Sequence, residues 1–224
     1  MKKSAAFNLK IILGICFLLL AGSTYAHTIN YALDKAPVSN VFWYYLKLGY
    51  MHILPNGFDH ILFVTGLCLL NNKLSTILWQ ATAFTVAHSI TLALSMKNII
   101  VAPTAVVEPI IALSILFIAI ENLLIAKLSP WRIMLVFMFG LIHGMGFASA
   151  LNEIGLPSDK FFLSIFSFNV GVELGQMTII LAVFALIITP FKSIKNYKQA
   201  IVYPLSIIIA SIAFYWTIER VFFV

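Results

Sequence analysis

The stretch Gly49–Leu70, GYMHILPNGFDHILFVTGLCLL, joins ionisable side chains directly to an apolar run. A Pro-Asn-Gly turn separates His52 from the adjacent Asp59 and His60, after which the stretch is almost wholly apolar. An ionisable pair beside hydrocarbon is costly unless it faces a partner, a cavity or an ion. This stretch therefore predicts a membrane helix that begins at a functional site.

The composition of the whole chain is typical of a membrane protein. Of its 224 residues, 62% are hydrophobic and 10% are charged, and the mean hydropathy is +1.02. In a typical soluble domain about a quarter of the residues are charged. The 14 basic residues are scattered between apolar runs and form no basic stripe of the kind that binds nucleic acid. We therefore expect an all-α, integral membrane helical bundle whose partner is the lipid bilayer, with no nucleic acid.

Residues 1–26 have the pattern of a cleavable signal peptide. Lys2 and Lys3 precede a short apolar core, and Ala26 ends a small-residue cleavage site. An uncleaved first helix is the alternative. Cleavage would leave His27 as the N-terminus outside the cytoplasm, where its amino group and ring could chelate a metal. We assign residues 27–57 to an extracytoplasmic segment that ends in an aromatic helix suited to the headgroup layer.

Residues 58–224 are expected to form a transmembrane domain of about six helices. The predicted spans are Phe58–Leu70, Ser75–Met96, Thr104–Leu123, Trp131–Leu151, Ser164–Ile188 and Ala200–Ile218. All but the first have about the 17–25 residues that cross hydrocarbon. A bent or re-entrant path through the preceding aromatic segment would complete the first span.

The distribution of basic residues predicts the orientation. With the mature N-terminus outside, the inner loops carry Lys73, Lys127, Arg132, Lys192, Lys195 and Lys198, whereas Lys97 and Lys160 lie in outer loops. This is the positive-inside bias. We expect the inner membrane of a bacterium, with both mature termini outside the cytoplasm.

This orientation brings polar side chains to one level of the bundle. The outer half of five helices carries Asp59, His60, His88, Glu108, His143, Asn169 and Glu173. Asn169, Glu173 and Gln176 share one helix face, and His88 and Ser89 belong to a second polar stripe. Small residues around His143, such as Gly140 and Gly144, would let helices approach closely.

These residue types suit a divalent transition-metal ion. Imidazole binds nickel, cobalt and zinc, and carboxylates complete the charge, whereas calcium takes oxygen ligands. Cys16 and Cys68 both lie in apolar runs and offer no multi-cysteine site. We predict His52, Asp59, His60, His88 and His143 as metal ligands, with Glu108, Asn169, Glu173, Ser89 and Gln176 as supporting or transient ligands.

Four separated motifs resemble the HupE/UreJ family, membrane proteins named for hydrogenase and urease accessory roles and regarded as nickel permeases. They are HILPNGFDHILFVTGLCLL, TAFTVAHSITL, FGLIHGMGFA and FNVGVELGQ, within residues 52–176. The family's metal-linked His–Asp–His motif maps onto His52, Asp59 and His60, and its second His–Gly motif onto His143 and Gly144. The longer first spacing and the absence of a glutamate after the second motif resemble the second branch of the family.

Three functions fit these observations. The resemblance favours a permease for nickel or cobalt, serving a metalloenzyme-maturation pathway. A metal-dependent intramembrane hydrolase with zinc is the alternative, in which Asp59 or Glu173 would be the general base. A non-catalytic accessory protein, whose polar layer merely holds the helices together, is the third.

Overall fold

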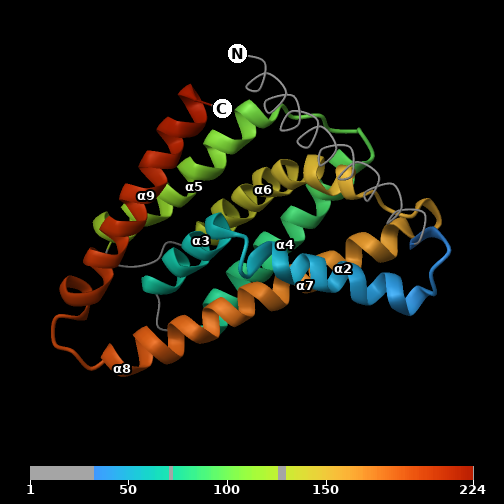
Figure 1. Ribbon diagram of the computed structural model, residues 1–224. Helices are drawn as coiled ribbons and strands as arrows, with labels where there is room; N and C mark the ends of the chain where they lie inside the picture. Colours follow the sequence, from blue (N-terminus) through green and yellow to red (C-terminus); the bar gives the residue numbers. More distant parts are fainter. Residues whose placement is uncertain (1–32, 71–72, 126–129, 224) are drawn as a thin grey trace, which may run out of the picture.

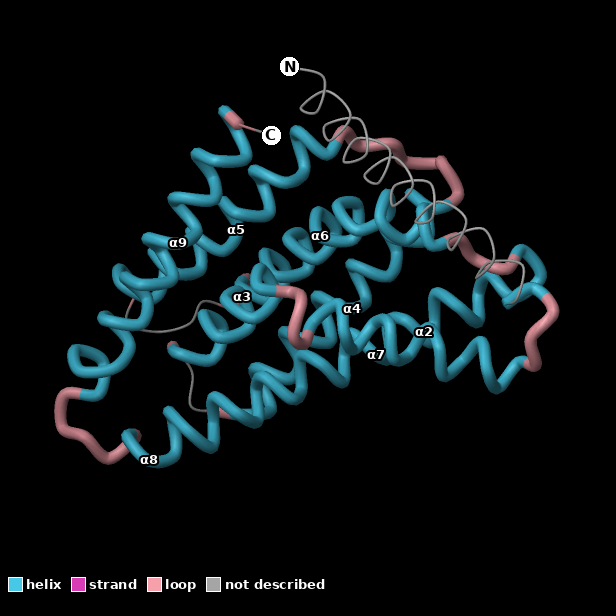
Figure 2. The backbone as a smooth tube through the Cα atoms, viewed as in Figure 1, coloured by secondary structure: helices cyan, strands magenta, loops and turns pink. Residues whose placement is uncertain are grey.

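The computed structural model describes residues 33–70, 73–125 and 130–223, which form helices and loops and no strand (Figures 1 and 2). The main helices are α2 (Val38–Ile53), α3 (Phe58–Leu69), α4 (Leu74–Met96), α5 (Thr104–Leu124), α6 (Arg132–Ile154), α7 (Phe161–Val183) and α9 (Tyr203–Phe222). The segment η2 (Phe184–Ile188) continues α7 into α8 (Thr189–Phe191), and η1 (Ser158–Lys160) and η3 (Lys198–Val202) precede α7 and α9. The proposed signal peptide, Cys16 and His27 lie outside the described residues.

The prediction of an all-helical membrane bundle is confirmed. Five apolar helical stretches are long enough to cross a bilayer: Leu74–Met96, Thr104–Leu124, Arg132–Ile154, Ser158–Phe191 and Lys198–Phe222. Helix α3 has 12 residues, which at about 1.5 Å per residue is too short to cross hydrocarbon alone. Its apolar character comes instead from its place inside the bundle.

Helix α2 packs lengthwise along α7, and the two run in the same direction. Position 49 of α2 meets position 168 of α7, and Ile53 meets Gly175 one to two turns further on. A Cβ atom at Gly49 would overlap the carbonyl oxygen of Phe168, so glycine permits this close approach of the two backbones. The placement of α2 in the headgroup layer stays a prediction. In the structure, α2 packs against α7, which belongs to a helical stretch of membrane length.

The helices pack as three close pairs around α3. Helix α4 packs on α6, α2 on α7, and α5 on α9, while α3 contacts α5 and α7. Figure 1 shows α3 between the α5–α9 pair and α7. The α4–α6 contact is also close, because a Cβ atom at Gly144 would overlap the carbonyl oxygen of His88. These contacts bring residues from separate helices toward the centre of the bundle.

Candidate metal centre

The loop between α2 and α3 brings two histidines together. His52 lies in the last turn of α2, and His60 lies in the first turn of α3. Their ring centroids are 4.8 Å apart. A Cβ atom at Gly57 would overlap the carbonyl oxygen of His52, so the chain can fold back this tightly only with glycine there. The Pro-Asn-Gly break in the sequence thus has a direct structural purpose.

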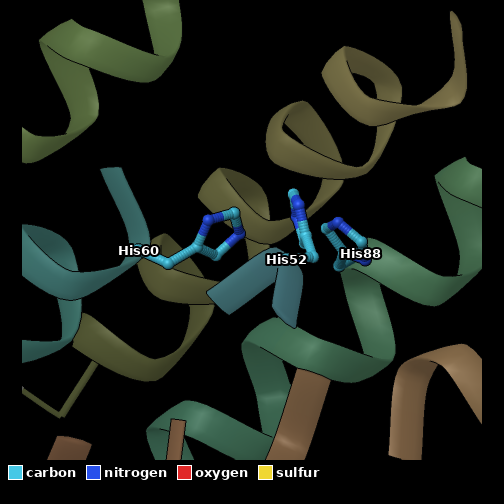
Figure 3. Close-up of side chains that lie close together, drawn as sticks. All are labelled: His52, His60 and His88. Atoms are coloured by element: carbon cyan, nitrogen blue, oxygen red, sulfur yellow. The ribbon is translucent and has the colours of Figure 1, made fainter. Parts of the chain in front are cut away.

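His88 of α4 completes a cluster of three imidazole rings (Figure 3). One ring nitrogen from each of His52, His60 and His88 lies within 4.8 Å of the corresponding nitrogens of the other two. The His88 ring centroid is 6.1 Å from those of His52 and His60. His60 and His88 are 6% and 0% exposed. The three rings could close on one metal ion after a small contraction, since N–metal bonds of about 2.0–2.1 Å require it.

The hydrogen bonds of Asn169 orient the His88 ring. The Asn169 amide Nδ2 donates to the carbonyl of Ile165 at 2.8 Å, so its Oδ1 is the atom that faces His88 Nδ1 at 3.2 Å. An amide oxygen only accepts, and His88 Nδ1 therefore carries the hydrogen. This leaves the lone pair on Nε2, the arrangement found in histidines that bind metals.

The buried nitrogens of the cluster have unmet bonding capacity. Within the described part of the chain, the Nε2 atoms of His52, His60 and His88 have no hydrogen-bond partner. A buried polar atom without a partner is unfavourable and rare in native proteins. A cation bound by these three atoms would give each of them a partner, so these residues fit a divalent transition metal.

His143 of α6 stands beside this cluster. Its ring centroid is 5.2 Å from that of His60, and its Nε2 lies 3.1 Å from Ser114 Oγ on α5. The Ser114 hydroxyl donates to the carbonyl of Ile111, so it must accept the hydrogen of His143 Nε2. The buried Nδ1 of His143 then carries a lone pair and has no partner in the described structure. His143, which the sequence predicts as a ligand, thus lies next to His60 but is not one of the residues whose ligand nitrogens lie within 4.8 Å of one another.

A layer of phenylalanines lies on one side of the histidines. Phe63 follows His60 by about one helical turn. Phe84 precedes His88, and Phe139 precedes His143, by about the same interval. The Phe63 centroid is 5.1 Å from that of Phe84 and 6.0 Å from that of Phe139. Phe63 and Phe84 are each 1% exposed, so these rings form a packed apolar wall beside the histidines.

A cavity of about 280 Å³ lies beside the histidines. Its lining includes His52, His60 and His143 together with Asp59 and Glu108. The cavity gives water or an ion a place next to the cluster, and its acidic lining favours cations.

The two carboxylates of this cavity are held by Arg220 of α9. Its guanidinium Nη2 lies 2.9 and 3.2 Å from the two Asp59 oxygens, and its Nη1 lies 3.1 Å from Glu108 Oε2. We call this arrangement of Arg220, Asp59 and Glu108 the arginine clamp. Asp59, which the sequence predicts as a metal ligand, is therefore placed beside the histidines but paired with an arginine.

The other predicted residues lie along the interface between α4 and α7. Glu173 accepts a hydrogen bond from Thr82 Oγ1 at 2.7 Å, and Gln176 donates to Thr85 Oγ1 at 2.8 Å. Glu173 Oε2 and Gln176 Oε1 are buried and have no donor among the described residues. Ser89 donates to the carbonyl of Thr85 in its own helix, so it is less available to a ligand.

Sequence reasoning did not single out Ser114 or Arg220 as parts of the site. Arg220 lies near the end of the last span and resembles an ordinary flanking charge. Ser114 lies in an apolar helix, where its hydroxyl can donate a hydrogen bond to a carbonyl of the same helix. An arginine at a membrane-embedded position needs an acidic partner, and this need could have indicated Arg220. Asp59 and Glu108 were available in the sequence as two such partners.

The fold and the buried polar centre define the class of protein. A bundle with five membrane-length apolar helices and a polar cluster at its core is an integral membrane protein. The chain belongs to the HupE / UreJ family, whose model matches residues 28–220. Comparisons with curated proteins and with solved structures gave no match.

Proposed function

We propose that the protein is a permease that takes up a divalent transition-metal cation, nickel or cobalt, through the three-histidine cluster. The observation that carries this proposal is the convergence of three imidazoles whose buried Nε2 atoms have no partner in the described structure. Nitrogen ligands of this kind suit nickel, cobalt and zinc. The resemblance to proteins regarded as nickel permeases favours nickel within this group.

The surroundings of the cluster support transport. The acidic cavity would admit the cation on one side, and the phenylalanine layer would hold it back on the other. A transported ion must also leave its site, which requires further weak ligands. Glu173 Oε2 and Gln176 Oε1 supply them, since they lie about one and two helical turns beyond Asn169 on α7 and have no donor in the described structure.

The residues at the end of α5 and the start of α6 are less suitable as ligands for an ion that leaves the histidine cluster. Glu121 is paired with Arg132, whose Nε lies 3.3 Å from its carboxylate, and Asn122 donates to the carbonyl of Gly66. The charge of Glu121 is therefore balanced by Arg132, although Glu121 Oε2 and Asn122 Oδ1, like Glu173 Oε2 and Gln176 Oε1, have no hydrogen-bond partner in the described structure. The ion's route would follow α7 instead.

The proposal includes a location and an orientation. We place the protein in the inner membrane of a bacterium, with residues 1–26 removed as a signal peptide and both mature termini outside the cytoplasm. The acidic cavity then faces outward. The delivered metal would serve the maturation of a metalloenzyme, as the accessory names of the family indicate.

A zinc-dependent intramembrane hydrolase is the second candidate. The cavity beside the histidines leaves room for a metal-bound water, which a catalytic zinc site requires. The candidate general bases are less suitable, because Asp59 is paired with Arg220 and Glu173 accepts a hydrogen bond from Thr82. For this reason transport is the better-supported function.

The test is metal uptake by liposomes that contain the purified protein and an entrapped nickel-sensitive dye. Wild-type protein should move Ni²⁺ inward, and His60→Ala should stop this movement. Thr178→Ala, which alters an exposed hydroxyl of α7, is the matched control and should transport normally. Equal dye signals with wild-type protein and with protein-free liposomes would refute the permease, and tight zinc binding in that case would direct the work to hydrolysis.

A further inference from the structure

The arginine clamp places a positive side chain where the chemistry of the cavity calls for a cation. Asp59 and Glu108 come from two different helices, α3 and α5, and both line the cavity that also contains His60 and His143. His60 and His143 are 6% and 2% exposed, and each has a ring nitrogen without a partner in the described structure. Two carboxylates that line a cavity beside buried ring nitrogens without partners make this a favourable place for a positive ion.

Arg220 holds this place through several contacts. Its guanidinium contacts both oxygens of Asp59, as well as the carboxylate and the backbone carbonyl of Glu108. One positive charge against two negative charges leaves the clamp with an excess of one negative charge. The Arg220 side chain is 16% exposed, so part of it lies at the surface of the bundle.

The guanidinium also contacts an aromatic ring in this same arrangement. Its central carbon lies 5.3 Å from the ring of Trp216, one turn earlier on α9. A cation–π contact of this kind stabilises an arginine that has lost part of its carboxylate contacts. The arginine can therefore give up the carboxylates without becoming isolated in an apolar environment.

We propose that Asp59 and Glu108 form a second divalent-cation site at the mouth of the cavity, which Arg220 occupies as a tethered cation until an incoming metal ion displaces it. This inference rests on the proposed function, because the site would receive the ion before it reaches the histidines. An oxygen-rich outer site would bind weakly and release the ion to the stronger nitrogen ligands. A monovalent ion would displace Arg220 less readily, since a doubly charged ion interacts about twice as strongly with the two carboxylates.

The test uses Mn²⁺, which prefers carboxylate and water ligands, as a probe of the mouth site. Binding to purified protein in detergent is followed by the loss of the free-Mn²⁺ electron paramagnetic resonance signal. Arg220→Gln should bind Mn²⁺ about tenfold or more tightly than wild type, the size expected for removing one positive charge a few ångströms from a divalent ion. Lys47→Gln, which removes an exposed positive charge from α2, should leave Mn²⁺ binding unchanged.

Double variants assign the site. Asp59→Asn added to Arg220→Gln should abolish the tighter Mn²⁺ binding, whereas His60→Ala added to Arg220→Gln should leave most of it. Millimolar guanidinium should compete with Mn²⁺ in Arg220→Gln, because it refills the place of the missing side chain. If Arg220→Gln does not fold, Arg220→Lys serves instead, since an ammonium cannot span both carboxylates and should give intermediate binding.

The outcomes separate this inference from the proposed function. Unchanged Mn²⁺ affinity in the folded Arg220 variant would mean that the clamp only ties α9 to α3 and α5, and the inference would fall. Ni²⁺ binding at the histidines would be unaffected by that result. Conversely, Mn²⁺ binding to Arg220→Gln without Ni²⁺ binding to wild type would keep the mouth site and remove the permease.

Discussion

Replacing Asn169 by alanine is expected to weaken Ni²⁺ binding by about 10-fold, within the 10- to 100-fold range for residues that orient a metal-binding histidine. Asn169 Oδ1 accepts the hydrogen of His88 Nδ1 at 3.2 Å. Without it, the metal-bound form must bury an N–H group that has no acceptor. The free ring is not fixed by a metal and can turn away, so Nε2 is no longer held toward the other two histidines.

The size of the effect follows from this asymmetry. An unsatisfied buried donor costs about 1–3 kcal/mol, and about 1.4 kcal/mol corresponds to a tenfold change in affinity. The 3.2 Å distance between His88 Nδ1 and Asn169 Oδ1 is at the long end of the range for hydrogen bonds. We therefore expect a cost in the lower half of the range of about 1–3 kcal/mol.

The assay is a Ni²⁺ titration of purified variants with a competing chelator. Asn169→Asp keeps an acceptor for His88 Nδ1 but replaces the Nδ2 donor to the Ile165 carbonyl by an oxygen, so its Ni²⁺ affinity should lie between those of Asn169→Ala and wild type. Ser167→Ala, which removes a hydrogen bond to the carbonyl of Leu163 in the same helix, controls for general damage to α7. The reasoning is refuted if Asn169→Ala keeps wild-type affinity while His88→Ala loses Ni²⁺ binding.

Two further predictions concern how the bundle is held together. Gly49→Ala should lower the thermal unfolding midpoint and weaken Ni²⁺ binding. The added Cβ would overlap the Phe168 carbonyl and push α2, which carries His52, away from α7. An unchanged midpoint in a melting curve would contradict the observed packing. Glu121→Ala should destabilise the protein by about 3–5 kcal/mol, since it leaves Arg132, which is 1% exposed, without its partner. Combining it with Arg132→Met should recover much of this loss in the same measurement, and additive losses would argue against a coupled pair.

The helices themselves were predictable from the sequence. Apolar runs of membrane length are bounded by charges and prolines, and the predicted span Thr104–Leu123 corresponds to α5, Thr104–Leu124. The convergence of His60, His88 and His143 could also be anticipated, because histidines at similar positions along antiparallel helices must lie at a similar level. Their spacing along each helix and the positive-inside bias were enough for that inference.

The partners within the site were beyond sequence reasoning. Whether Asp59 faces a metal or an arginine depends on where α9 packs, and residue 220 lies far along the chain. The aromatic residues of α2 favoured a helix in the headgroup layer. Tyr45 is fully buried and donates to the carbonyl of Gly155, the residue that follows α6. The residue types of α2 alone do not reveal this distant partner.

We propose that His52, His60 and His88 bind one divalent metal ion. X-ray absorption spectroscopy of the Ni²⁺-loaded protein identifies the ligand atoms around the ion and so tests this proposal. We expect about one nickel per chain with at least three imidazole nitrogens as ligands, and a loss of the ion in His60→Ala while the variant stays folded. A nickel ion surrounded only by oxygen, or one retained with an unchanged spectrum in His60→Ala, would show that the three histidines do not hold the metal.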